Sequence, residues 1–514
     1  MRNFGSTSRS LFAANGLVGV GLVIGLVNNV AIATMFGLTH RVDAFYAALM
    51  LPNLFMALFM DYLGRNFLPA FARARRQSAA LASELTSSIV TIVALIAVAV
   101  AAVLVLASKP LFTLLLPGFD AAQVSLVSRY FSIMSPVIVL LAVNVFHQYV
   151  CQHDEDFVFI NAASIALPLA NLVAILGLGR FLGEYALPVG YLLGNVTVFA
   201  LMSARAGYRY SWRIVVRTEW EGKIFFNSTI VMGSGLVART RVLITNYIAS
   251  LLGGGAISAL AMSSRFIDPL GRTVFTAVKM MMFSRVARLA VDRNSKEIGR
   301  LYDVGIGASL LVLAPLIWWI GLNSKEIVEV LLLRGRFDAD MAMLVSLALV
   351  GGVPAVAFVE LGTVLNNAFY ALERVATPAL VMPLGTLIYL VLAPSFAAEY
   401  GVLGLTMSAS AVHFAIFVIM TALLARRIES FKALRAFGYV LRYAVIGGSC
   451  SFAALALVRL TGLPSGAVSA LALPLGVSLY GVVLFALKDR MLGFVYRHAR
   501  NCVPLPRGAR DVSV

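Results

Sequence analysis

Several arginines stand inside long apolar segments, where a charged side chain has little water around it. Arg239 and Arg241 lie in the middle of the apolar segment 224–252, and Arg265 lies in the next one, 256–284. An arginine at the centre of a membrane helix costs about 2.5–3.5 kcal/mol on the insertion scale, so these side chains should face the protein interior. Guanidinium groups stay protonated and bind phosphate in a bidentate way. These residue types therefore predict a cationic cavity for an anionic group, phosphate or pyrophosphate.

Acidic residues accompany some of these cations at helical spacing. Arg265, Asp268 and Arg272 follow one another at intervals of three and four residues, so they share one helix face. Asp61 and Arg65 repeat the spacing of the last pair in an earlier segment. Two interpretations stay open: the arginines bind substrate, or they pair with these carboxylates and fasten helices. We predict substrate binding by Arg265 and Arg272, and coupling or gating by Asp61, Arg65 and Asp268.

Three further ionisable residues belong to the predicted site. Arg239 and Arg241 have no acidic residue close in sequence, which favours a ligand-binding role for both. They are two positions apart, so on a helix they diverge by about 200°, and one cavity reaches both only if it wraps around that helix. Glu360 lies in the apolar segment 339–370 with no basic residue nearby. It is either a protonatable coupling group or a protonated, hydrogen-bonded core carboxyl.

No residue pattern in the sequence predicts catalysis or metal binding. The chain contains no P-loop, no Gly-x-Ser-x-Gly elbow and no HExxH zinc motif. Cys151, Cys450 and Cys502 are far apart and have no metal-ligand spacing. We expect a transporter rather than an enzyme, with no catalytic residues, no metal and no cofactor. Transport would be driven by the membrane potential or by a coupled ion.

The elements that must position these charges are membrane helices. Hydrophobic residues make up 60% of the 514 residues and charged residues only 13%, and the mean hydropathy is +0.90. Soluble domains are about a quarter charged, so an ordinary soluble enzyme is excluded. The apolar runs are continuous and much longer than the roughly ten residues of a barrel strand. We predict an all-α polytopic membrane protein with about 14 transmembrane helices, over 11–37, 44–72, 79–108, 121–151, 158–179, 185–204, 224–252, 256–284, 301–322, 339–370, 377–398, 401–425, 436–458 and 465–487.

The positive charge of the chain follows the predicted topology. The net charge is +17, but the basic residues lie in short loops between apolar runs, so a nucleic-acid partner is rejected. If the N-terminus is cytoplasmic, 26 Lys and Arg fall on the cytoplasmic side and seven on the other. Basic residues are enriched in cytoplasmic loops, where they contact anionic membrane lipids. We therefore predict that both termini are cytoplasmic.

Two sequence patterns recur at similar offsets. Residues 59–65 and 266–272 share five of seven positions, 207 residues apart, and the Leu-Leu-Leu-Pro-Gly-Phe-Asp-Ala stretch at 114–121 returns as Leu-Leu-Leu-Arg-Gly-Arg-Phe-Asp-Ala at 331–339. Helices 1–6 and 7–12 are therefore predicted to be two copies of one six-helix unit, related by a pseudo-twofold axis along the membrane normal, with a substrate cavity between them. The predicted domains are an N-lobe 1–205, a cytoplasmic amphipathic linker 206–223, a C-lobe 224–427, two further helices within 428–488, and a basic cytoplasmic tail 489–514.

A set of short motifs occurs in order along the chain. They are Asp43-Ala44-Phe45, Leu51-Pro52-Asn53-Leu54, Phe67-Leu68-Pro69, Pro117-Gly118-Phe119, Arg334-Gly335-Arg336-Phe337, Phe369-Tyr370 and Thr377-Pro378. Together they resemble the MurJ/MviN lipid II flippases of the MOP superfamily. Arg265 falls where that family has a functional arginine in its eighth helix, and 14 spans is the family's number.

The resemblance implies a function and adds two residues to the site. It implies alternating access of two lobes that moves an undecaprenyl-pyrophosphate-linked saccharide across the bacterial inner membrane, from the cytoplasmic to the periplasmic leaflet, for peptidoglycan biosynthesis. The lipid tail would travel in a groove near helices 13 and 14, and the protein would be monomeric. Asp43 and Asn53, within the family motifs, join the predicted substrate-binding residues. The chain departs from the family in carrying Leu22, Asn28 and Met56 where arginines are usual.

Other classes of protein remain as alternatives. Compared with the family, this chain lacks the usual arginines of helices one and two and carries Arg239 and Arg241 in helix seven. A flippase for an exopolysaccharide or O-antigen lipid-linked repeat unit is therefore an alternative to a lipid II flippase. A MATE-like drug/cation antiporter would need an acidic cavity, whereas the predicted cavity is basic. A non-transporting membrane scaffold would need an added cytoplasmic domain, and a membrane glycosyltransferase would need clustered acids.

Overall fold

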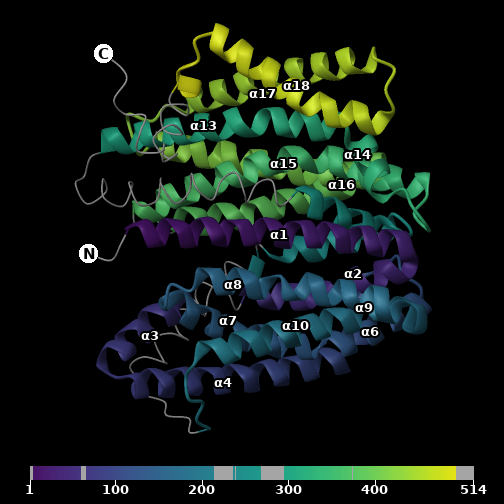
Figure 1. Cartoon of the computed structure of the whole chain (residues 1–514), viewed down its shortest axis with the longest axis vertical. Coiled ribbons are helices and arrows are strands. Elements are labelled where there is room, and N and C mark those ends of the chain that lie inside the picture. The colour runs from purple at the N-terminus through teal and green to yellow at the C-terminus, as the bar shows by residue number, and fades with distance from the viewer. Residues whose placement is uncertain are drawn as a thin grey trace. The chain divides into compact units, whose positions relative to one another are not determined.

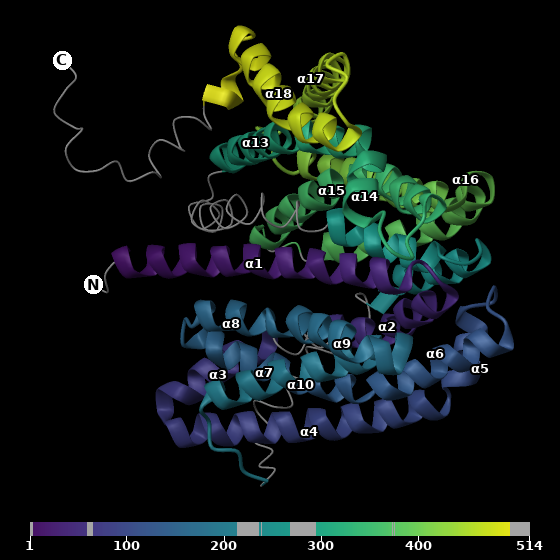
Figure 2. The same cartoon turned by 45° about the vertical axis from the view of Figure 1, so that its right-hand side comes forward.

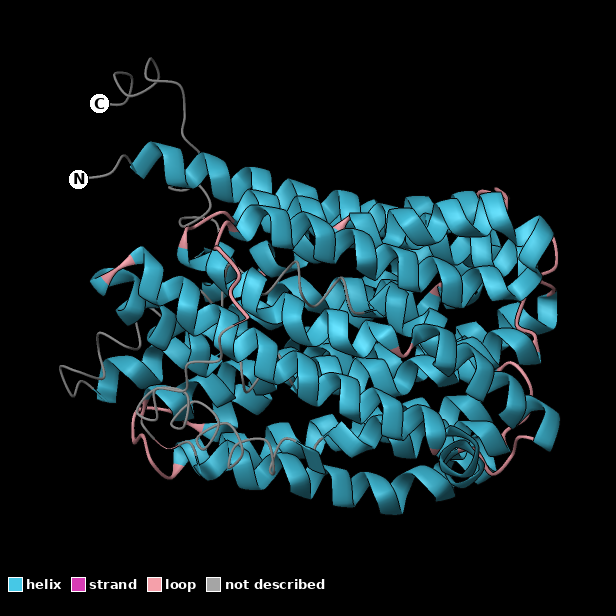
Figure 3. Ribbon diagram, turned by 90° about the horizontal axis from the view of Figure 1, so that it is seen from below, coloured by secondary structure: helices cyan, strands magenta, loops and turns pink. Residues whose placement is uncertain are grey.

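The computed structural model describes residues 4–58, 65–212, 236–237, 239–267, 295–372, 374 and 376–493. Within these ranges every regular element is helical and no strand occurs, as Figure 3 shows. The all-α prediction from continuous apolar runs is confirmed.

Long apolar helices dominate the described ranges. Nine helical stretches there have the length and hydropathy needed to cross a membrane. Two of these stretches, Phe157–Ala206 and Ala376–Ala425, contain 50 residues each. A helix of that length would extend about 75 Å, more than twice the hydrocarbon thickness of a bilayer. Both are interrupted by a glycine with positive φ, Gly183 at 58° and Gly401 at 60°, so each stretch supplies two crossings.

The described residues cluster into two compact units that interleave in sequence. The first unit comprises Met1–Phe266, Leu331–Ala348 and Thr386–Ser408, and the second comprises Ile267–Val330, Leu349–Gly385 and Ala409–Val514. The predicted lobe, linker and tail boundaries stay a prediction. The helices, labelled in Figure 1, are α1 (Phe4–Phe36), α2 (His40–Leu58), α3 (Arg65–Gln77), α4 (Ala79–Leu106), α5 (Ser108–Leu115), α6 (Ala121–Met134), α7 (Pro136–His153), α8 (Phe157–Ser164), α9 (Ala166–Leu182), η2 (Gly183–Tyr185), α10 (Ala186–Ala206), α13 (Ser295–Leu322), α14 (Ser324–Leu332), α15 (Ala339–Ala371), α16 (Ala376–Ala425), α17 (Ala433–Arg459) and α18 (Ser465–Ala486).

In the first unit, long helices pack side by side around α7 and α10. α10 contacts α9 and α7, α4 contacts α7, and α2 contacts α6. α1 runs along α8 and α9, as Figure 2 shows. Two further helical segments also belong to this unit, one over 239–251 and one over Ala256–Ile267.

Local sequence signals fix where several of these helices begin. Ser78 caps α4, because its Oγ accepts a hydrogen bond from the Leu81 amide at 3.0 Å. Asp120 and Gln123 form a reciprocal capping box at the start of α6. Such caps satisfy amides that the first turn leaves without an intrahelical partner.

In the second unit, α13, α17 and α18 pack against one another. Small residues allow close approach here: a side chain added at Gly447 would meet the backbone of Ala314, and one added at Gly448 would meet the Trp318 ring. The Trp319 indole donates a hydrogen bond to the Ser469 carbonyl at 2.9 Å, which ties α13 to α18.

Many large apolar side chains remain exposed on the outside of the helices. On α4, Leu106 is 85% exposed, and on α18, Phe485 is 79% exposed. Soluble proteins rarely carry extended apolar surfaces, so these faces are suited to lipid. Together with the helix lengths, they make this chain a multi-pass membrane protein.

The predicted linker is described only over its first residues. Residues 207–212 are not helical. The Tyr208 hydroxyl lies 3.0 Å from Nε2 of His147 on α7, and the Tyr210 hydroxyl lies 2.6 Å from Oγ1 of Thr91 on α4. Burial raises the pKa of Tyr208. This short segment is therefore docked on the first unit through its tyrosines.

Candidate functional site

Arg265 lies inside the first unit on the helix Ala256–Ile267. Its Nη1 donates a hydrogen bond to Oδ1 of Asn29 on α1 at 3.0 Å. Its guanidinium carbon lies 5.5 Å from the centroid of the Tyr46 ring on α2, within the range of a cation–π contact. In the described part of the chain, no carboxylate forms an ion pair with Arg265. Neutral groups orient this cation and leave its charge uncompensated.

The partners of Arg265 on α1 and α2 are buried polar groups. Asn29 is 1% exposed and Tyr46 is 6% exposed. Neither Oδ1 of the neighbouring Asn28 nor the Tyr46 hydroxyl has a hydrogen-bond partner within the described ranges. Buried polar atoms are nearly always satisfied, so the orphaned hydroxyl of Tyr46, whose ring contacts the cation, indicates a place where a polar ligand binds.

Asn53 and Tyr191 add further polar groups to this region. Asn53 is exposed on α2, and its Oδ1 accepts a hydrogen bond from the Tyr191 hydroxyl of α10 at 3.5 Å. The guanidinium of Arg265 lies near enough to the hydroxyls of Tyr191 and Tyr46 to interact electrostatically with both. Polar groups of α1, α2 and α10 therefore gather near the guanidinium, and Asn53 is the predicted site residue that joins Arg265 there.

Asp43 positions the helix that carries Arg265. The fully buried carboxylate of Asp43 accepts hydrogen bonds from the Gly255 amide, from the Ser258 amide at 2.8 Å, and from the Ser258 hydroxyl. These groups form the first turn of the helix Ala256–Ile267, where an acidic cap is favourable because of the exposed amides and the helix dipole. Asp43 is thus a positioning residue, and direct contact with substrate stays a prediction.

Two motif glycines make matching close approaches at the same end of the first unit. A Cβ at Gly118 would overlap the carbonyl oxygen of Ser250, and a Cβ at Gly335 would overlap that of Thr34. The glycines are 217 residues apart and their partners 216 residues apart. The loop of each predicted repeat therefore touches the end of the first helix of the other repeat, as an internal twofold requires.

Arg239 and Arg241 lie on the helical segment 239–251 of the first unit. Both side chains are half-buried. Arg241 interacts electrostatically with the hydroxyl of Tyr389 on α16. That hydroxyl also lies 2.9 Å from Oγ1 of Thr245. Joint action of Arg265 and Arg241 on one ligand stays a prediction.

The remaining predicted residues are distributed as follows. Glu360 is buried in α15, in the second unit, and its coupling role stays a prediction. Asp61, Asp268 and Arg272 and the side chain of Arg65 lie outside the described residues.

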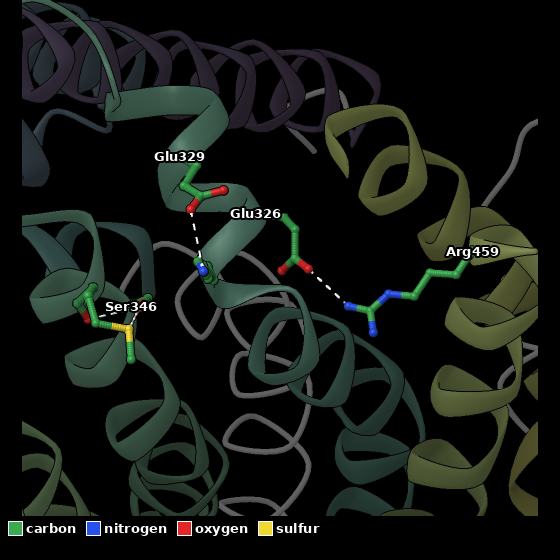
Figure 4. Close-up of polar contacts among 6 residues, drawn as sticks. Glu326, Glu329, Ser346 and Arg459 are labelled. Atoms are coloured by element: carbon green, nitrogen blue, oxygen red, sulfur yellow. Dashed lines mark hydrogen bonds and ion pairs between the residues drawn. The ribbon is translucent and has the colours of Figure 1, made fainter. Parts of the chain in front are cut away.

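Arginines of the second unit pair with carboxylates of other elements. The pairs are Arg435 with Asp303 at 3.2 Å, Arg442 with Asp489 at 2.9 Å, and Arg459 with Glu326 at 3.0 Å. Figure 4 shows Arg459 reaching Glu326 of α14 from the end of α17. These arginines join helices through ion pairs. This is the second of the two roles that the sequence allowed for Arg265, which forms no such pair in the described chain.

Sequence reasoning missed Asn29, Tyr46 and Tyr191. Asn28 and Asn29 are adjacent amides inside the apolar segment 11–37, and this pair was a usable signal. The tyrosines gave none, because aromatic residues are common in membrane helices.

This fold and site define a class of protein: a multi-pass membrane transporter with a cation held inside its helical bundle. The family of lipid II flippases named MurJ matches residues 32–475, so the chain belongs to the lipid II flippase MurJ family. The family predicted from the ordered motifs is confirmed.

Individual relatives agree with this assignment, and solved structures share the fold. The chain is 24% identical over 383 residues to the lipid II flippase MurJ of Burkholderia cenocepacia, covering 72% of this chain and 74% of that protein. It is 26% identical over 418 residues to a probable lipid II flippase MurJ of Rhizobium meliloti, covering 73% and 74%. Its fold is similar to that of a lipid II flippase MurJ in an inward closed conformation, with a TM-score of 0.77 at 17% identity, over 94% of this chain and 99% of that one. It is also similar to an inward-facing MATE family multidrug transporter of the MOP superfamily, with a TM-score of 0.67 at 14% identity, over 80% and 95%.

Proposed function

We propose that this protein translocates lipid II across the bacterial inner membrane by alternating access, for peptidoglycan biosynthesis. The observation that carries the proposal is Arg265, a cation inside the bundle with an amide and an aromatic ring as partners and no paired carboxylate in the described chain. A diphosphate headgroup supplies the negative charge that this site lacks, and a guanidinium binds it through several hydrogen bonds.

The orientation follows from the charge asymmetry. Both termini lie in the cytoplasm, so the turn between α1 and α2 faces the periplasm. The close approaches of Gly118 and Gly335, and the Asp43 cap, then close the periplasmic end of the first unit. Alternating access requires these contacts to break when the protein opens outward.

The lipid tail has a candidate location in the second unit. A cavity of about 770 Å³ lies at the end of α18, lined by Gly481, Phe485 and Leu492, with Lys488 and Asp489 at its polar side. Its apolar lining suits a prenyl chain, and Lys488 suits an anionic lipid. This cavity agrees with a tail groove near the last two helices.

The protein works as a monomer without a cofactor, and the membrane potential or a coupled ion drives release of the substrate. Glu360, buried in α15, is the candidate coupling residue. A transporter releases its ligand only if the outward state binds it more weakly, which requires the charge balance of the site to change between states.

Complementation and reconstitution test the proposal and identify the glycan. The protein should sustain growth of a strain depleted of its own lipid II flippase and should move labelled lipid II across proteoliposomes. Arg265→Gln should lower both activities by about tenfold or more, whereas Arg459→Gln should keep them. If the wild-type protein moves an O-antigen or exopolysaccharide repeat unit but not lipid II, the lipid II assignment is wrong.

A further inference from the structure

A second cavity lies in the first unit, at the end that holds the turn between α1 and α2. It has a volume of about 530 Å³, is open on one side, and is lined by three separate segments: the start of α2, one face of α6, and the turn between α9 and α10. The polar residues that line it include Arg41, Arg129, Tyr130 and Glu184. None of these residues belongs to the site around Arg265.

The lining carries one uncompensated positive charge. Arg41 donates to Glu184 at 3.0 Å, so these two charges neutralise each other. Arg129 is exposed and makes no hydrogen bond or ion pair with any described residue. An anion with one negative charge would balance the cavity.

Tyr130, which lines this cavity, carries a buried hydroxyl that also lacks a partner in the described chain. Tyr130 is 0% exposed, and its hydroxyl finds no hydrogen-bond partner in the described chain. Its ring packs edge-on against Tyr185, with centroids 5.0 Å apart. A buried donor without an acceptor is costly, and an oxyanion in the cavity would satisfy it.

The rim of the cavity is apolar and turned outward. Phe181 is 85% exposed and Leu182 is 42% exposed, at the end of α9. Exposed aromatic and aliphatic side chains beside arginines are typical of the membrane–water interface. A ligand of this cavity therefore carries an anionic group together with an apolar chain.

We propose that this cavity binds the phosphate group of a membrane lipid. Arg129 and the Tyr130 hydroxyl donate hydrogen bonds to the phosphate oxygens, Arg41 is held in place by Glu184, and the lipid chain lies against Phe181 and Leu182. The occupant is either a resident phospholipid or the transported lipid after its release, since both present lipid phosphate. The site stands independently of the function of Arg265.

Lipid titration of the full-length protein, followed by native mass spectrometry, tests the proposal. The probes are phosphatidylglycerol, diacylglycerol as the lipid without phosphate, and a polyprenyl diphosphate. Arg129→Gln and Tyr130→Phe should each weaken phosphatidylglycerol binding by about fivefold or more, because each removes a donor to phosphate. Diacylglycerol binding should not change.

Arg180→Gln is the matched control, because Arg180 is an exposed basic residue at the same end that does not line the cavity. It should leave all three affinities unchanged, and so should Arg265→Gln for phosphatidylglycerol. If the two cavity variants weaken only polyprenyl diphosphate binding, the site holds and its occupant is the transported lipid. Unchanged affinity for both phosphate lipids in Tyr130→Phe, which keeps the ring packing, would overturn the proposal.

Discussion

Arg265 and Arg459 belong to the same protein, yet their charges meet opposite surroundings. Arg265 lies in the first unit against an amide and an aromatic ring, whereas Arg459 in the second unit pairs with Glu326 at 3.0 Å. Arg435 and Arg442 follow the second pattern. An arginine held by neutral groups still attracts an anionic ligand. An arginine paired with a carboxylate attracts such a ligand less, because the carboxylate neutralises its charge and the pair joins two helices.

The largest expected effect comes from removing the charge that has no carboxylate partner. Arg265→Gln keeps a polar side chain for Asn29 but loses the cation, and we expect a loss of lipid II transport of about tenfold or more, since a charged hydrogen bond contributes roughly 1.5–3 kcal/mol. The measurement is the initial rate of lipid II flipping in proteoliposomes. Arg459→Gln breaks an exposed ion pair, which contributes only about 0–1 kcal/mol. Equal flipping rates for the two variants would contradict the claim that Arg265 binds substrate whereas Arg459 only joins helices.

The cap formed by Asp43 gives the next effect, because it positions the helix that carries Arg265. Asp43→Asn removes a charged acceptor of three donors, so we expect a loss of about 1.5–3 kcal/mol in stability and a lower melting temperature. Asp120→Asn is the control, since Asp120 caps α6 at an exposed position where asparagine caps about as well. A melting temperature of Asp43→Asn equal to that of Asp120→Asn would contradict the positioning role.

The two units also differ in how closely a left-handed glycine is packed, as Gly335 in the first unit and Gly462 in the second show. Gly335 has φ of 62°, and an added Cβ would overlap the carbonyl oxygen of Thr34, whereas Gly462 has φ of 68° with open space around it. Both alanine variants carry the strain of a left-handed residue, about 1 kcal/mol. Only Gly335→Ala also disrupts the contact with α1, so its melting temperature should fall further than that of Gly462→Ala. Identical melting temperatures would mean that the contact contributes nothing.

The smallest expected effect concerns the orphaned hydroxyl beside Arg265. Tyr46→Phe keeps the ring on the guanidinium and removes an oxygen that has no partner in the described chain. Transport should fall about two- to fivefold if that hydroxyl meets the headgroup, while the melting temperature should not fall. Tyr480→Phe removes a similar orphaned hydroxyl in the second unit and should leave transport unchanged. A fall in melting temperature at unchanged transport would assign the Tyr46 hydroxyl a purely structural role.

The helical fold and the central arginine could be predicted from the sequence, because both depend on local patterns. Continuous apolar runs require helices in lipid, and a charge inside such a run requires an internal partner or a ligand. The sequence could not show which of these Arg265 has, because Asn29 is 236 residues away and is an uncharged residue of an apolar helix. The cap of Asp43 was hidden for the same reason, since Ser258 lies 215 residues further along the chain.

Equilibrium binding of lipid II to the purified wild-type, Arg265→Gln and Arg459→Gln proteins tests the central claim most directly. The account predicts that Arg265→Gln binds lipid II about tenfold or more weakly at an unchanged melting temperature, while Arg459→Gln binds it like the wild type. Wild-type affinity in Arg265→Gln would contradict the claim that this arginine holds the diphosphate.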